Sequence, residues 1–116
     1  MNRVFTLYTC DTSRRILAKL DLEGFEIIDI KKHGIEPEQL EEMKALAGSY
    51  QSLFSRRSRS YAKQGLKNKV LSESDYRQLI LSDYTFLKRP VIVLSDKIYI
   101  GNQKKNVELL IKNLGK

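Results

Sequence analysis

The sequence predicts an α/β protein whose mixed four-stranded sheet is assembled from two separated parts of the chain. Two observations support this prediction. The N-terminal part has the pattern strand, helix, strand, and the C-terminal part has the pattern strand, strand, helix. The residues between them show helical periodicity and turn residues but no further strand pattern. We therefore expect a core of residues 1–30 and 86–116, with a helical insertion over residues 31–85.

The N-terminal part is predicted to form a β-α-β unit. Residues 3–8 are rich in β-branched and aromatic side chains, which favour a strand. Residues 12–22 have apolar side chains at helical spacing, and Gly24 suits the left-handed position after a helix. Residues 25–30 then form a second apolar run. A unit this short implies two parallel strands joined by a right-handed crossover.

The middle of the chain is predicted to hold two clear helices. Residues 31–35 form a polar connector in which His33 is expected to be exposed. Pro37 suits the first turn of a helix that ends at Gly48. Residues 49–60 are irregular, with Leu53 and Phe54 as anchors to the core, and a short helix is expected over residues 61–66. Ser72 begins a capping-box pattern and is the expected N-cap of the next helix.

The C-terminal part is predicted to be a hairpin followed by a helix. Residues 91–94 are entirely apolar, residues 95–96 suit a turn, and residues 97–100 form another strand pattern. The short connection implies antiparallel pairing. Val107, Leu110, Ile111 and Leu114 then have the spacing of an amphipathic helix.

Composition limits the class of protein. The chain has 116 residues, 41% of them hydrophobic, which suits one domain with a single core. No apolar run is long enough to span a membrane, and the first strand pattern begins too early to leave room for a signal peptide. One cysteine excludes an internal disulfide, and one histidine with one cysteine argues against a zinc site. We therefore expect a cytoplasmic location and no bound metal.

The formal net charge of +7 favours anionic partners. One basic cluster begins at Arg56, Arg57 and Arg59, and another lies near the C-terminus. Direct nucleic-acid binding through the first cluster, next to Tyr61, is one hypothesis. A solvated surface that keeps the protein in solution is the simpler interpretation, and short basic runs of this kind are common.

Cys10 is the candidate reactive residue. It falls where the first strand pattern gives way to the first helix pattern. Backbone N–H groups at a helix start favour negative charge, and the thiolate is the reactive form of cysteine. Arg14 and Arg15 follow within about one helical turn. The alternative is that Cys10 is an ordinary buried side chain, as lone cysteines often are.

The element order, β-α-β then β-β-α, matches a thioredoxin-like fold. Within it the sequence resembles the arsenate reductase-like family, which includes glutaredoxin-linked arsenate reductases and Spx-type transcription regulators. The matching segments run over nearly the whole chain. They are Cys10-Asp-Thr-Ser-Arg14, Leu53-Phe54-Ser55-Arg56-Arg57 leading to Tyr61, Leu87-Lys88-Arg89-Pro90-Val91, and Ile100-Gly101-Asn102.

The resemblance implies a role for each matching residue. Cys10 would be the nucleophile, and Arg14, Arg57 and Arg89 would bind an oxyanion or stabilise the thiolate. Pro90 would be a cis-proline beside the cysteine. The substrate would be a small oxyanion or a disulfide. No cofactor would be bound, and glutathione or glutaredoxin would act as the external reductant.

Two departures from the family pattern bear on function. Asn102 stands where family reductases carry a third arginine, which weakens the case for arsenate as substrate. Ser13 stands where Spx-type proteins often have a second cysteine, so an internal disulfide switch is excluded. The register leaves Arg56 as a substitute for Arg57. The alternative function is an Spx-like binding module of the transcription machinery that does not catalyse a reaction.

Overall fold

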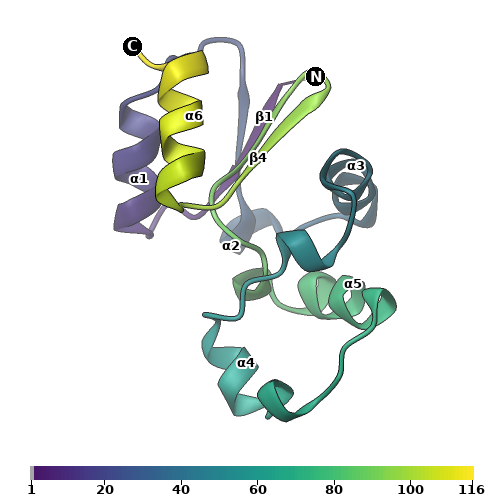
Figure 1. Ribbon diagram of the computed structural model, residues 1–116. Coiled ribbons are helices and arrows are strands. Elements are labelled where there is room, and N and C mark those ends of the chain that lie inside the picture. The colour runs from purple at the N-terminus through teal and green to yellow at the C-terminus, as the bar shows by residue number, and fades with distance from the viewer. Residues whose placement is uncertain (1) are drawn as a thin grey trace. The chain divides into compact units, whose positions relative to one another are not determined.

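The computed structural model describes residues 2–116, which separate into two compact units (Figure 1). The first unit comprises the residues up to His33 together with Arg89–Lys116, and the second comprises Gly34–Lys88. The sequence predicted the insertion over residues 31–85. Among residues 2–116, no helix combines the length and the apolar character needed to cross a bilayer.

The first unit contains a four-stranded sheet, as predicted. Its strands are β1 (Arg3–Thr6), β2 (Glu26–Asp29), β3 (Val91–Leu94) and β4 (Lys97–Ile100). They are ordered β2-β1-β3-β4 across the sheet. β1 pairs in parallel with β2 and antiparallel with β3, and β3 pairs antiparallel with β4. The β-α-β unit and the hairpin of the prediction are therefore both confirmed.

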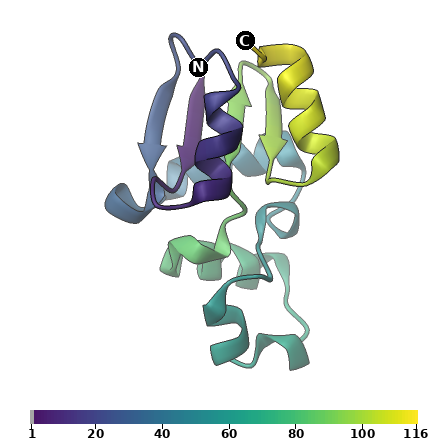
Figure 2. The same cartoon turned by 90° about the vertical axis from the view of Figure 1, so that its left-hand side faces the viewer.

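Helices α1 (Asp11–Ala18) and α6 (Lys104–Leu114) cover one face of this sheet (Figure 2). Alternate side chains of the central strands point toward them, because successive residues of a strand face opposite sides. Val4 and Ile92 are opposite each other in the β1–β3 register and are completely buried. They pack with Ile16 of α1 and Leu110 of α6. This cluster is the apolar core between the sheet and the two helices.

Helix α1 ends four residues earlier than the predicted boundary at residue 22. The chain leaves the helix because it pairs with the C-terminal end of the protein. Leu20 forms a β-bridge with Gly115, and the N–H of Asp21 donates to the carbonyl oxygen of Leu114 at 2.7 Å. Leu20 is buried in the core, so tertiary packing overrides the helical spacing of the sequence.

The prediction of a polar connector over residues 31–35 was wrong in part, because a one-turn helix, α2 (Ile30–His33), follows β2 directly. Ile30 is completely buried and anchors the turn to the core. The Asp29 carboxylate accepts a hydrogen bond from the N–H of Lys31 at 3.1 Å, which satisfies one backbone donor of the turn. His33 is exposed, as predicted.

The second unit is helical. Its α-helices are α3 (Pro37–Ala47), α4 (Arg59–Lys63) and α5 (Glu73–Ser82), and short 3-10 turns lie at Gln51–Leu53, Leu66–Asn68 and Tyr84–Phe86. Ser72 caps α5 by accepting a hydrogen bond from the N–H of Asp75, and Asp75 bonds back to the N–H of Ser72. The predicted capping box is therefore confirmed. Gly48 ends α3 with a φ of 93°, a value that favours glycine.

Phe54 lies at the centre of the second unit's core. Its ring contacts those of Tyr76 and Phe86, with centroids 4.9 and 5.1 Å apart. The backbone of residues 53–55 also pairs with residues 86–88: the N–H of Ser55 donates to Phe86, and the N–H of Lys88 donates to Leu53. The predicted anchoring by Leu53 and Phe54 is confirmed, since both side chains are buried.

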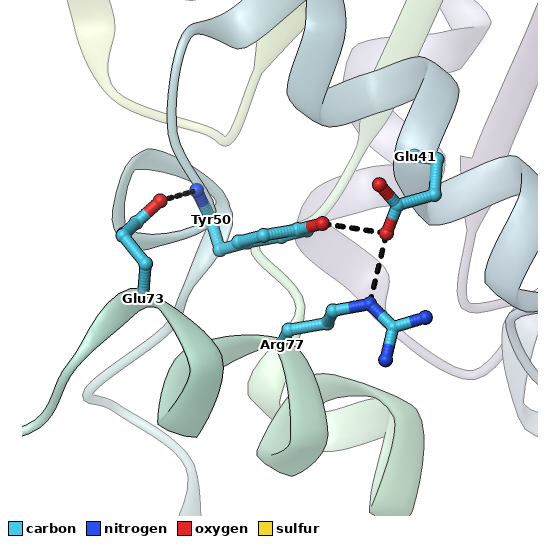
Figure 3. Close-up of polar contacts among 4 residues, drawn as sticks. All are labelled: Glu41, Tyr50, Glu73 and Arg77. Atoms are coloured by element: carbon cyan, nitrogen blue, oxygen red, sulfur yellow. Dashed lines mark hydrogen bonds and ion pairs between the residues drawn. The ribbon is translucent and has the colours of Figure 1, made fainter.

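Polar contacts between the start of the first 3-10 turn and helices α3 and α5 complete the second unit (Figure 3). The Glu73 carboxylate accepts hydrogen bonds from the backbone N–H groups of Tyr50 and Gln51, at 2.7 and 3.0 Å. The Tyr50 hydroxyl donates to Glu41 at 2.5 Å, and Nε of Arg77 donates to the same oxygen at 2.8 Å. One carboxylate from α3 and one from α5 therefore fix the position of Tyr50.

Candidate active site

Cys10 occupies the N-cap position of α1, one residue before the first helical residue. The chain reaches it through a turn after β1, in which the N–H of Cys10 donates to the carbonyl oxygen of Leu7 at 3.0 Å. Its own carbonyl oxygen accepts the first helical hydrogen bond, from Arg14 N–H. The side chain is partly buried and is not in a disulfide. The predicted placement at the helix start is therefore confirmed.

Ser13 is the residue that lowers the pKa of the Cys10 thiol most. The sulfur accepts no capping hydrogen bond in this structure. Hydrogen bonding by the backbone N–H and the hydroxyl of Ser13 nevertheless lowers the pKa of the Cys10 thiol, because both groups favour the thiolate. The Ser13 hydroxyl is completely buried and has no other hydrogen-bond partner among residues 2–116. A buried donor without another acceptor stabilises an anion placed next to it.

Arg89 is the cation that lowers the pKa of the Cys10 thiol. Partial burial raises the pKa of the Cys10 thiol, but the Ser13 hydrogen bonds and then the charge and hydrogen bond of Arg89 lower it. The net result is a pKa below the ordinary value of a cysteine thiol. A lower pKa increases the share of thiolate at neutral pH.

Pro90 follows Arg89, and the bond between them is cis, as expected. Pro90 is buried, and its carbonyl oxygen accepts a hydrogen bond from the N–H of Gly101 at 2.8 Å. The side-chain amide of Asn106 in turn donates to the carbonyl oxygen of Gly101 at 2.7 Å. The start of β3 and the end of β4 are joined at this point, which fixes the backbone next to Arg89.

Arg14 lies in the first turn of α1, and its role toward an anion stays a prediction. Its guanidinium is exposed and forms an ion pair with the carboxylate of Asp11, three residues earlier in the same helix. It does not contribute to the lowered pKa of Cys10. Arg15 is directed to the same turn, where its Nε donates to the carbonyl oxygen of Asp11 at 3.5 Å. Of the predicted arginines in the first unit, only Arg89 contributes to the lowered pKa of the Cys10 thiol.

Arg57 belongs to the second unit, where it lies on an exposed turn between the first 3-10 turn and α4. Its N–H donates to the hydroxyl of Ser55 at 3.3 Å, and its guanidinium has no hydrogen-bond or ion-pair partner among residues 2–116. The same is true of the Arg56 guanidinium. The role of Arg57, or of Arg56 in its place, stays a prediction.

A network of hydroxyl groups holds the turn that carries these arginines. Ser58 is buried and caps α4, and its hydroxyl lies 2.6 Å from that of Thr85. Thr85 donates to one oxygen of Asp83 at 2.7 Å, and the hydroxyl of Ser60 donates to the other at 2.6 Å. The turn is therefore connected on both sides of Arg59 to the segment that follows α5.

Sequence reasoning missed the role of Ser13, which it treated only as the position of an absent second cysteine. The available signal was its spacing. A residue three positions after an N-cap presents its N–H to the capping side chain. Among residues 2–116, no cluster of three or more histidine, cysteine, aspartate or glutamate side chains is arranged to hold a metal ion.

The fold and this site define the class of protein: a thioredoxin-like fold with a single thiol at the start of its first helix. The ArsC family model matches residues 5–110. The chain therefore belongs to the ArsC family.

Solved structures agree with this assignment. A possible arsenate reductase from Streptococcus mutans is 29% identical, with a TM-score of 0.73 over 93% of this chain and 98% of that one. A protein of Staphylococcus aureus is 30% identical, with a TM-score of 0.72 over 95% and 98%. An arsenate reductase from Vibrio cholerae is 17% identical with a TM-score of 0.77 over 97% of both chains, which shows the fold alone. No functionally curated protein matches the sequence.

Proposed function

We propose that this protein is a thiol oxidoreductase of the arsenate reductase type, in which Cys10 is the nucleophile. The observation that carries the proposal is the position of the Cys10 sulfur, at a helix start beside the buried hydroxyl of Ser13 and the guanidinium of Arg89. These groups favour the thiolate, which is the attacking form. Membership of the ArsC family and the likeness to proteins named as arsenate reductases support the same chemistry.

The proposed reaction uses two thiols. The Cys10 thiolate attacks the central atom of an oxyanion, a bond forms between them, and one oxygen leaves as water after taking up protons. An external thiol such as glutathione then attacks the Cys10 sulfur. The electron pair of the bond that breaks stays with the central atom, which is thereby reduced, and a mixed disulfide remains on Cys10. A second thiol, from glutaredoxin or another donor, releases Cys10 by disulfide exchange.

Arginines would bind the anion during these steps. Arg89 is adjacent to the sulfur, and a guanidinium binds an oxyanion through two parallel N–H donors. Arg57, with Arg56 as its substitute, would be the second cation. Asn102 is exposed after β4, at the place where a third arginine was expected. A neutral side chain there favours a smaller or less charged substrate, and a disulfide is the second substrate class that we propose.

The second candidate is an Spx-like module that binds the transcription machinery without catalysis. The net charge of +7 supports this candidate, because it favours an acidic surface as partner. The two candidates differ in whether a substrate reaches Cys10. Co-purification with RNA polymerase subunits, by a Cys10→Ser variant as well as by the wild type, would favour the binding module.

The test is the pH dependence of Cys10 alkylation by iodoacetamide on folded protein, with and without arsenate. An unperturbed thiol titrates at about 8.5. We expect a midpoint well below that value and protection of the thiol by arsenate, which would place an oxyanion beside the sulfur. A midpoint at or above 8.5 with no effect of arsenate would contradict the proposal.

Turnover separates the two substrate classes. Release of the reduced oxyanion in the presence of glutathione and glutaredoxin would identify an arsenate reductase. Reaction with glutathione disulfide, without reduction of arsenate, would identify a general thiol oxidoreductase. The Cys10→Ser variant is the control, since it keeps the size of the side chain but removes the nucleophile.

A further inference from the structure

Two aliphatic hydroxyl groups, those of Thr6 and Ser13, are buried in the described part of the first unit, residues 2–33 and 89–116. Thr6 is 2% exposed and Ser13 is completely buried. The Thr6 hydroxyl has no hydrogen-bond partner among residues 2–116, and the only group on which the Ser13 hydroxyl acts there is the Cys10 thiol. Burying a hydroxyl without a partner is costly, so two of them in one unit require an explanation.

The two hydroxyl groups lie at the same end of the unit formed by β1 and α1. Thr6 is the last residue of β1, and Ser13 lies in the first turn of α1. Only the turn of residues 7–10, closed by the hydrogen bond from the N–H of Cys10 to the carbonyl oxygen of Leu7, separates the two elements. The chain therefore brings both residues to the end of the sheet at which Cys10 lies.

Strand β1 and helix α1 direct the two side chains into the same interface. Thr6 comes two residues after Val4, so both side chains point to the same face of the sheet. Ser13 comes three residues before Ile16, and these two are the buried residues of α1. Val4 and Ile16 belong to one apolar cluster between the sheet and the helices (Figure 2). Because α1 runs back along β1, Thr6 lies beneath Ser13, one layer closer to Cys10 than that pair.

The strand register also places Thr6 next to the start of β3. The last pair of the antiparallel β1–β3 ladder is Phe5 with Val91, so the next pair along is Thr6 with Pro90. Pro90 is buried and directly follows Arg89, the cation that lowers the pKa of the thiol. Thr6 is therefore next to both parts of the site, the first turn of α1 and the segment that carries Arg89.

We propose that Thr6 is a positioning residue of the Cys10 site, which acts through the hydroxyl of Ser13. One buried water between the two hydroxyl groups is enough to join them, because buried waters bridge polar groups that lack another partner. Thr6 then donates to the water, the water donates to the Ser13 oxygen, and the Ser13 hydroxyl is held with its proton toward the sulfur. Hydrogen bonds aligned in this way strengthen one another. The inference rests on the proposed function, since it assigns a further residue to the same thiol.

A role in packing alone does not account for the hydroxyl of Thr6. The cluster beside it consists of apolar side chains, and valine has nearly the same shape as threonine. Replacing a buried hydroxyl that has no partner by an apolar group of the same shape is neutral or stabilising. A purely structural position would therefore be filled at least as well by valine, and the hydroxyl indicates a polar task at this point.

The test compares Thr6→Val with Thr6→Ser in the pH profile of Cys10 alkylation and in urea unfolding. Thr6→Val keeps the shape but removes the hydroxyl, so the profile should move to higher pH, and alkylation below its midpoint should slow about threefold. Thr6→Ser keeps the hydroxyl but loses a buried methyl group, so it should unfold at lower urea concentration while its profile stays that of the wild type. A role in packing alone would instead alter the profile in Thr6→Ser and leave it unchanged in Thr6→Val.

A double-mutant cycle tests whether Thr6 acts through Ser13. In the Ser13→Ala background, Thr6→Val should cause no further slowing of alkylation, because the group through which it acts is gone. Slowing by the same factor in both backgrounds would show that the two residues act independently and would overturn the proposal. Thr12→Val makes the same change on an exposed position of α1 and should leave the profile unchanged.

A crystal structure of the wild type at high resolution would test the link itself. We expect one water within hydrogen-bond distance of both hydroxyl groups, and no such water in Thr6→Val. Hydroxyl groups that neither share a water nor contact each other, or a wild-type alkylation profile in Thr6→Val, would overturn the proposal. Failure of the proposed function gives a different result, a wild-type midpoint at or above about 8.5. Failure of this inference alone leaves the low wild-type midpoint and the effect of Ser13→Ala in place.

Discussion

The hydroxyl of Ser60 donates a hydrogen bond to the carboxylate of Asp83 at 2.6 Å, and this bond joins the first turn of α4 to the residue that follows α5. The other oxygen of the same carboxylate accepts from the N–H and the hydroxyl of Thr85. Thr85 in turn contacts the buried hydroxyl of Ser58. One carboxylate therefore determines where the turn that carries Arg57 lies within the second unit.

Asp83→Asn should destabilise the second unit by about 1–2 kcal/mol at neutral pH, because hydrogen bonds to a charged group are worth more than those to an amide. Partial burial raises the pKa of Asp83, but the bonds from Ser60 and Thr85 lower it, and the net shift is downward. The stabilisation is therefore present above the unfolded pKa of about 3.9 and is lost as pH falls through the lower folded pKa.

Urea unfolding of wild type and Asp83→Asn at neutral pH and near pH 3 measures this effect. The difference in unfolding free energy should be largest at neutral pH and should shrink in acid. Asp96→Asn, at the exposed turn between β3 and β4, is the charge-matched control and should change stability by less than about 0.5 kcal/mol. Equal destabilisation at both pH values would contradict the charge-based argument.

Glu73→Ala should also weaken the second unit, because it leaves the N–H groups of Tyr50 and Gln51 without their acceptor. Loss of a helix-start acceptor costs about 0.5–2 kcal/mol. Hydrogen exchange of these two amides is the direct readout, and both should exchange faster than in the wild type. Glu108→Ala on the exposed surface of α6 is the control. Unchanged protection of both amides in Glu73→Ala would show that the carboxylate does not hold the turn.

The sequence predicted correctly those helix ends that are fixed by residues close to them in the chain. Pro37 and Gly48 define α3, and Ser72 with Asp75 defines the start of α5, because caps act on neighbouring backbone groups. The end of α1 was missed since it depends on Leu20 meeting Gly115, far away in the sequence. The turn α2 was missed for a similar reason: Ile30 is buried by tertiary packing that a polar connector does not predict.

The candidate site was likewise predicted in part from the sequence, and the rest required the structure. The strand-to-helix transition predicted where Cys10 lies, and the order of the motifs predicted that Arg89 and Pro90 adjoin a strand start. The sequence did not predict that Arg14 pairs with Asp11, although a carboxylate three residues away on a helix is a ready competitor. Nor did it show that the Ser13 hydroxyl is buried without another acceptor, which requires coordinates.

Tyr50→Phe should raise the pKa of Glu41. The hydrogen bond from the Tyr50 hydroxyl is the main cause of the lowered pKa of that carboxyl, followed by the bond from Arg77. Removing the phenol oxygen leaves the second donor in place, so the pKa should move part of the way back to its ordinary range. Carbon-13 NMR titration of the glutamate carboxyl groups measures it directly. The stability that Glu41 contributes above its unfolded pKa of about 4.3 should shrink accordingly.

Arg77→Gln is the companion variant. It removes the charge but leaves the Tyr50 hydroxyl, so its effect on the pKa of Glu41 should be the smaller of the two. A larger shift in Arg77→Gln than in Tyr50→Phe would mean that the exposed ion pair dominates this site. That result would contradict the geometry, in which the 2.5 Å bond from Tyr50 is the shorter contact.

Ser13→Ala should raise the pKa of the Cys10 thiol. Burial already raises it, and the Ser13 hydroxyl is the first of the groups that lower it. The variant keeps the Ser13 backbone N–H and the charge of Arg89, so we expect a partial rise. Alkylation by iodoacetamide should slow at neutral pH and reach the wild-type rate in alkaline solution, where the thiol is ionised in both proteins.

Thr12→Ala, one position earlier in the same helical turn, is the control for Ser13→Ala. Its side chain is exposed and makes no contribution to the thiol pKa, so its alkylation profile should overlay that of the wild type. Alanine is a good helix former, so neither variant should unfold α1. If Ser13→Ala leaves the midpoint unchanged while Arg89→Leu raises it, the cation alone stabilises the thiolate. If neither variant moves the midpoint, Cys10 is a structural cysteine and its proposed role as nucleophile fails.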